Sequence, residues 1–107
     1  MIGLAAQEIV RGLVYVTGAT LYSQCVNPAA EPQAACMSYI MGAIDLEAIG
    51  EGVGRLPPTL CLPENVPPAR LRDIVVAYYR ANPDKRQYSA AGVVVTALAV
   101  EYPCAKA

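Results

Sequence analysis

Four cysteines are the residues of this sequence whose type and number most directly imply chemistry. They are Cys25, Cys36, Cys61 and Cys104, at wide and unequal spacing. An even number of cysteines in a short chain favours disulfides, which persist in oxidising compartments. Histidine is absent and no Cys-x-x-Cys pair occurs, so structural zinc and a histidine-activated thiol are both disfavoured. The sequence therefore predicts two structural disulfides, with four inert buried thiols as the alternative.

Of the three possible pairings of these cysteines, we expect Cys36–Cys61 and Cys25–Cys104. The first bridge would tie the start of a central helix to the approach of the next long helix. The second would clamp the first helix to the C-terminus. Both would stabilise the fold by restricting the unfolded chain.

Carboxylates are the other groups here that can do chemistry, and Asp45, Glu47 and Glu51 lie close together in the sequence. Residues two apart on a helix do not face each other, so a solvated helix side is a better interpretation of Asp45 and Glu47 than acid–base catalysis. Without histidine, a metal-ligand set or a nucleophile–base pair, we expect no enzyme, no metal and no cofactor. The net charge of −1, with no run of like charge, also disfavours a nucleic-acid partner.

Composition suggests one domain, residues 1–107, with more apolar surface than its core can hide. Apolar residues make up 55% and charged residues 16%, against roughly 45–50% and 25% for an average soluble domain. This surplus favours a self-association or partner-binding surface. No stretch of 18 apolar residues occurs, so we expect no membrane insertion. The start lacks the pattern of a secretory signal, so either the chain is cytosolic or a signal ahead of Met1 has been removed; the cysteines favour a removed signal.

We expect a central helix over residues 33–49, which carries Cys36 and the carboxylates of Asp45 and Glu47. Its apolar side chains at Met37, Ile40, Met41 and Ile44 follow the i, i+3, i+4, i+7 pattern of a helix with one buried face. Gly42 interrupts this helix at a cost of about 1 kcal/mol relative to alanine. We therefore expect another segment to pack closely against the backbone at Gly42.

The remaining elements are predicted to be helices joined by proline-rich loops. A second clear helix ends before Asn82 and buries Leu71, Ile74, Val75 and Tyr78. Thr17 and Ser89 are suitable N-caps for the first and last helices. The expected helices are residues 3–11, 18–25, 33–49, the stretch ending at 81, and 90–102; residues 13–16 are an extended segment without a partner, and 50–60 and 82–89 are loops. The fold class is all-α, a small bundle of four to five helices braced by two disulfides.

The most polar stretch, residues 82–89, is our candidate for partner recognition. A charged loop that ends in a tyrosine suits the contact surface of a binding protein, although such loops are often only connections. The predicted contact residues are Asp84, Lys85, Arg86, Gln87 and Tyr88, together with Arg55 in the loop after the central helix.

Several motifs now coincide with those of one known family. Residues 36–45 look like its C-x-x-Y-x-x-G-x-x-D motif, with Cys36, Tyr39, Gly42 and Asp45 at the expected positions. Cys61-Leu62-Pro63, followed by Val66 and Leu71, looks like its C-x-P…V…L segment. Residues 17–25 fit its short first helix ending in cysteine, and Tyr102-Pro103-Cys104 fits its closing motif. Over about residues 17–104 the chain resembles the Rap/Tai immunity proteins, which are loosely related to the acid-stress chaperone HdeA in helical architecture.

This resemblance implies a function that the residues alone do not. It implies a non-enzymatic, all-helical periplasmic protein, usually a homodimer, that blocks the cleft of a peptidoglycan amidase effector delivered by type VI secretion. The motif residues would be scaffold and not contact residues. The alternative is an HdeA-like stress chaperone or housekeeping protein without an amidase partner.

Overall fold

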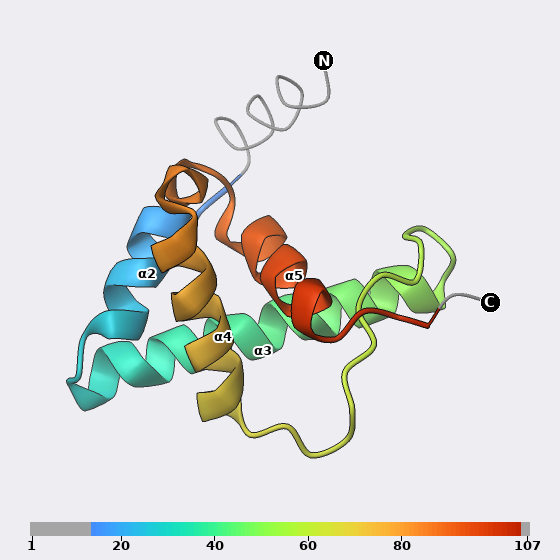
Figure 1. The fold of residues 1–107 in the computed structure, drawn as a ribbon, viewed down its shortest axis with the longest axis horizontal. Coiled ribbons are helices and arrows are strands. Elements are labelled where there is room, and N and C mark those ends of the chain that lie inside the picture. Colours follow the sequence, from blue (N-terminus) through green and yellow to red (C-terminus); the bar gives the residue numbers. More distant parts are fainter. Residues whose placement is uncertain (1–13, 106–107) are drawn as a thin grey trace.

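The computed structural model describes residues 14–105 of the chain. These residues form four α-helices and a short 3₁₀ helix, joined by loops (Figure 1). In chain order they are α2 (Gly18–Val26), α3 (Ala30–Gly52), α4 (Pro68–Ala81), η1 (Pro83–Gln87) and α5 (Ala90–Glu101). These residues contain two isolated β-bridges and no strand. The predicted all-α bundle is therefore confirmed. The helix predicted for residues 3–11 lies outside the described residues.

The segment before α2 has a partner, contrary to the sequence-based expectation. Thr17 caps α2 as predicted, since its side chain accepts a hydrogen bond from the Thr20 amide. On either side of it, the Ala90 amide donates to the Val16 carbonyl at 3.1 Å, and the Gly18 amide donates to the Tyr88 carbonyl at 2.8 Å. Tyr88 and Ala90 lie far from this segment in the sequence, so short-range sequence patterns could not identify them as its partners.

Helix α3 is the longest helix of the described chain, and α2, α4 and α5 all pack against it (Figure 1). It is longer at both ends than predicted. Its core face carries Cys36, Ile40 and Ala43, whereas Met41 of the expected stripe is 40% exposed. The expectation for Gly42 was wrong as well, because nothing within the described chain lies within 4 Å of a Cβ built there. The true buried face is thus rotated from the predicted one.

Helices α4 and α5 complete the core. Pro68 begins α4, where a missing amide hydrogen costs nothing. Leu71, Ile74 and Val75 are buried as predicted, but the fully buried tyrosine is Tyr79, and Tyr78 is only partly covered. Helix α5 ends one residue earlier than expected, and Ser89 precedes it without a side-chain capping bond. Within residues 82–89, predicted to be a loop, Pro83–Gln87 form η1.

The two disulfides join Cys25 to Cys36 and Cys61 to Cys104, so the predicted pairs Cys36–Cys61 and Cys25–Cys104 were wrong. The short connection between α2 and α3 leaves the Cα atoms of Cys25 and Cys36 5.0 Å apart. From Cys36 the chain then runs along α3 to Gly52, about 24 Å at 1.5 Å per residue. Cys61 lies beside the C-terminal segment instead, and its amide donates to the Tyr102 carbonyl at 3.0 Å.

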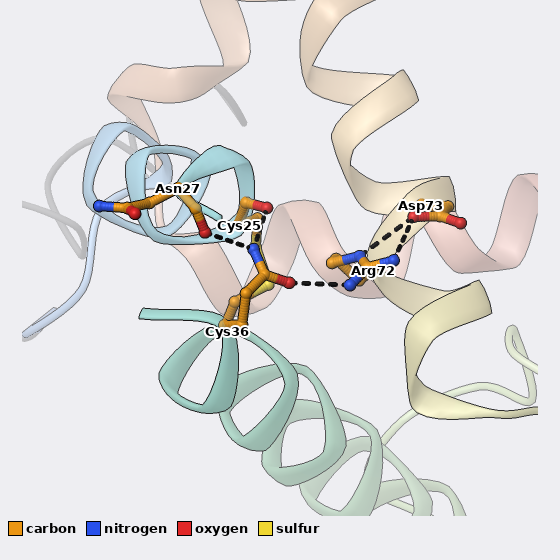
Figure 2. Close-up of polar contacts among 6 residues, drawn as sticks. Cys25, Asn27, Cys36, Arg72 and Asp73 are labelled. Carbon is orange, nitrogen blue, oxygen red and sulfur yellow. Dashed lines mark hydrogen bonds and ion pairs between the residues drawn. A yellow bond between two sulfur atoms is a disulfide. The ribbon is translucent and has the colours of Figure 1, made fainter. Parts of the chain in front are cut away.

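A hydrogen-bonded joint beside the first disulfide fixes how α2, α3 and α4 meet (Figure 2). The Gln33 side-chain amide donates to the carbonyl oxygens of Cys25 and Asn27, at 2.8 and 2.7 Å. Its oxygen accepts from the Arg72 guanidinium at 2.8 Å, and Arg72 also pairs with Asp73. One side chain thereby satisfies two carbonyls at the end of α2 and connects them to α4.

Tyr79 carries a prediction about stability at high pH. Its side chain is fully buried, its hydroxyl has no hydrogen-bond partner, and burial raises its pKa to about 12. In the unfolded chain Tyr79 ionises near the ordinary tyrosine pKa of about 10. The free energy of unfolding is therefore unaffected by this ionisation below that pH, and it falls as the pH rises from about 10 towards the raised pKa of the folded state. We expect Tyr79→Phe to be more stable than the wild type by about 1 kcal/mol at neutral pH. The difference should grow by about 1.4 kcal/mol by pH 11.

Urea unfolding at neutral pH and at pH 11 measures this difference. Tyr15→Phe is the matched control because the Tyr15 side chain is fully exposed. Equal pH dependence of the Tyr79→Phe variant and the wild type would contradict a neutral buried phenol at Tyr79.

Candidate functional site

Helix η1 carries four of the predicted contact residues, Asp84 to Gln87, at one end of the bundle, and Tyr88 follows directly after it. Asp84 and Gln87 are exposed, and Lys85 is partly covered. The Lys85 ammonium lies 4.0 Å from an Asp84 oxygen and 5.6 Å from the Tyr88 ring centroid. The Tyr88 side chain packs against the core. The exposed polar surface of η1 therefore consists of Asp84, Lys85 and Gln87.

Arg86 has a structural position that sequence reasoning did not anticipate. Its guanidinium stacks 3.9 Å from the Tyr22 ring centroid and donates to the Tyr79 carbonyl at 3.4 Å. Its Nε atom is buried without a hydrogen-bond partner. Arginine stacked on an aromatic ring contributes packing as well as charge. Arg86 thus anchors η1 to α2 and α4.

Arg55 is not brought together with η1. It lies in the exposed turn that follows α3, where its amide donates to the Gly50 carbonyl. This turn is at the opposite end of α3 from η1 (Figure 1). The predicted recognition residues therefore belong to two separate surfaces.

A groove lies near Arg55, where α3 extends past the bundle and the following segment folds back along it. This α3 groove has a volume of about 610 Å³. Its apolar lining includes Ile44, Ala48, Leu60 and Leu62, and its polar lining is Glu47 and Glu51. Glu47 and Glu51 are one helical turn apart and face the same side. The i, i+4 spacing of Glu47 and Glu51 is the sequence signal for this pair, because residues four apart on a helix are neighbours and residues two apart, such as Asp45 and Glu47, are not.

The two carboxyl groups of the α3 groove interact with each other and with the returning segment. Glu51 Oε2 accepts hydrogen bonds from the Thr59 and Leu60 amides, both at 3.2 Å. A hydrogen bond from the Glu47 carboxyl raises the pKa of Glu47 and lowers that of Glu51, and the backbone donors lower the pKa of Glu51 further. The two carboxyl groups therefore influence each other, and only that of Glu51 is held by the returning segment.

A second unexpected surface is an apolar stripe on the exposed, outer face of α3 and its C-cap Val53. Leu46, Ile49 and Val53 follow the i, i+3, i+7 spacing and are 66%, 63% and 66% exposed. They account for part of the apolar surplus in the composition. Single exposed apolar residues are ordinary, but three in one row are typical of an interaction surface.

Comparison with known protein families identifies the family to which the chain belongs. The model of the Rap1a immunity proteins matches residues 17–104, which include all four helices and both disulfides. This chain belongs to the Rap1a immunity proteins. No curated protein and no solved structure gives a match. The family resemblance inferred from the cysteine, tyrosine and proline spacing is thereby confirmed.

As an immunity protein, the molecule acts by binding an effector partner. Two further findings concern only residues 14–105. No group of three or more metal-ligating side chains comes together there. None of the helices in this range combines the length and the apolar character needed to cross a membrane.

Proposed function

We propose that this protein is a non-enzymatic periplasmic immunity protein that binds and blocks a peptidoglycan amidase effector of a type VI secretion system. Membership of the Rap1a immunity proteins is the observation that carries this proposal. Two disulfides and no free cysteine among the described residues are consistent with an oxidising compartment.

The architecture suits a rigid inhibitor. One disulfide fixes α2 to α3, and the other fixes the segment after α3 to the C-terminal residues. Little conformational entropy is then lost on binding, which favours tight association. We propose Asp84, Lys85 and Gln87 as contacts at one end, with Arg86 and Tyr88 holding η1 in place, and Arg55 as a contact at the other end.

We also propose that the protein is a homodimer. The apolar stripe of Leu46, Ile49 and Val53 supports a second copy packed against the outer face of α3. A two-fold axis would let the same stripe cover itself, as in most small homo-oligomers. Each protomer would keep η1 and the α3 groove away from this contact, because both lie elsewhere on the surface.

The decisive experiment mixes the oxidised protein with the purified amidase effector encoded in the same bacterium. We expect inhibition of peptidoglycan cleavage, and light scattering after size exclusion should give a complex with two copies of the immunity protein. Charge reversal at Lys85 together with Gln87→Glu should weaken binding by at least tenfold without lowering the melting temperature, since neither residue is buried. Glu64→Lys, at an exposed position away from η1, is the control.

Two results would count against the proposal. Full amidase activity at excess immunity protein would exclude inhibition. Suppression of aggregation of unrelated proteins at low pH, without one stoichiometric partner, would support the chaperone alternative instead. Unchanged affinity of the Lys85/Gln87 variant would remove η1 from the contact surface but leave the immunity function intact.

A further inference from the structure

The α3 groove is an open cavity whose two glutamates form no ion pair within the described chain. The three ion pairs among residues 14–105 join Arg70 to Glu101, Arg72 to Asp73 and Lys85 to Asp84. None of them includes Glu47 or Glu51. Two carboxyl groups one turn apart repel each other when both are ionised. A cation placed between them would relieve this repulsion.

The volume and the lining of the groove favour one kind of side chain as its occupant. About 610 Å³ is within the range of sites that hold a ligand or several side chains. Ile44 and Leu62 supply apolar walls, and the two glutamates supply the acidic part. Lysine and arginine match this combination because they place a long apolar stem on an apolar surface and keep the charged head with polar groups.

We propose that the α3 groove receives a lysine or arginine side chain presented by the effector. The cationic head would lie between the carboxyl groups of Glu47 and Glu51, and the stem would contact Ile44, Leu60 and Leu62. This inference rests on the proposed function for its partner and adds a second contact surface, separate from η1.

Other occupants fit the groove less well. Nucleic acid and lipid phosphates are anionic and would be repelled by the glutamates. A divalent metal ion requires about six oxygen ligands, whereas Glu51 Oε2 is already used by the Thr59 and Leu60 amides. A wholly apolar segment would bury the carboxyl groups without a partner, which is costly.

The groove can be tested with a simple probe on the full-length, isotopically labelled protein. A capped tripeptide with lysine between two leucines is titrated while backbone amide signals are followed by NMR. We expect saturable shifts at Thr59, Leu60 and the last turns of α3. The same tripeptide with uncharged norleucine in place of lysine should bind at least fivefold more weakly.

Glu47→Gln is the test variant, since Glu47 accepts no backbone hydrogen bond that holds the returning segment. It should weaken lysine-tripeptide binding at least threefold. Asp45→Asn removes the same charge from an exposed position outside the groove lining and should leave binding unchanged. Equal binding of the lysine and norleucine tripeptides, or no effect of Glu47→Gln, would overturn the groove assignment.

The same variants separate this inference from the proposed function. If the effector binds wild type tightly and Glu47→Gln at least tenfold more weakly, with Asp45→Asn unchanged, the groove receives the effector. If it binds Glu47→Gln as tightly as wild type, the groove inference fails and the immunity function stands. If no amidase binds at all, the proposed function fails, while the tripeptide titration still decides whether the groove accepts a basic side chain.

Discussion

Replacing Gly18 by alanine should lower the free energy of unfolding by about 2 kcal/mol. Gly18 begins α2 and lies directly under η1. A Cβ atom there would lie 2.8 Å from Arg86 Cα and 2.9 Å from the Lys85 carbonyl oxygen. It would also lie 2.9 Å from the buried Tyr79 hydroxyl. The first two neighbours are backbone atoms, which cannot move aside as a flexible side chain can.

The close contact at Gly18 also determines how η1 is presented. The Gly18 amide donates to the Tyr88 carbonyl, so any shift that accommodates a methyl group strains this bond. If η1 contacts the effector, Gly18→Ala should weaken binding as well as stability. Urea unfolding measures the first effect and titration with the effector the second.

Gly92→Ala is the control for Gly18→Ala. Gly92 lies near the start of α5, and a Cβ built there meets nothing within 4 Å. Alanine should therefore keep or raise stability, by up to about 1 kcal/mol, through its higher helix propensity. If Gly18→Ala were as stable as wild type, the tight packing of η1 on α2 would be contradicted.

Removing the disulfides should have larger effects still. In the chain-entropy treatment, the Cys61–Cys104 bridge, with a sequence separation of 43, contributes about 4 kcal/mol. Cys25–Cys36, with a separation of 11, contributes about 3 kcal/mol. A domain of this kind is typically stable by about 5–15 kcal/mol. Each double cysteine-to-alanine variant should therefore fold with reduced stability, and loss of both bridges should leave most molecules unfolded.

Unfolding in urea under oxidising conditions measures each double variant, and the other bridge serves as the internal control. Cys25 and Cys36 are buried, so their replacement also removes packing contacts. Cys61 is exposed, so the cost at the second bridge should be that of the cross-link itself. Equal stability of wild type and the Cys61/Cys104 variant would contradict the constraint on the C-terminal residues.

The pairing itself can be read from a tryptic digest without reduction. Cys25 and Cys36 lie in one tryptic peptide, residues 12–55, whereas Cys61 and Cys104 lie in peptides 56–70 and 87–106. The observed pairing predicts peptide 12–55 alone, with an internal bridge, and peptides 56–70 and 87–106 joined. The pairing first expected would join all three peptides into one species. The masses of the products distinguish these two patterns.

Local sequence determined which segments are helical. Thr17 caps the N-terminus of α2, Pro68 begins α4, and Asn82-Pro83 ends α4, because these residues act on their immediate neighbours. The even number of cysteines likewise indicated two disulfides. Together with the spacing of these cysteines, the tyrosine, glycine and proline positions were sufficient to indicate the family.

Tertiary structure decided which faces and which cysteines meet. Helix α3 has apolar residues both on its core face and on its outer stripe of Leu46, Ile49 and Val53, so periodicity alone could not identify the buried face. Cys61 forms its disulfide with Cys104 in the C-terminal segment, and Thr17 pairs with Ser89 in an isolated β-bridge. The α3 groove exists only because the segment after α3 folds back onto Glu51. Contacts between distant segments depend on how the helices pack, and short-range sequence patterns carry little information about that packing.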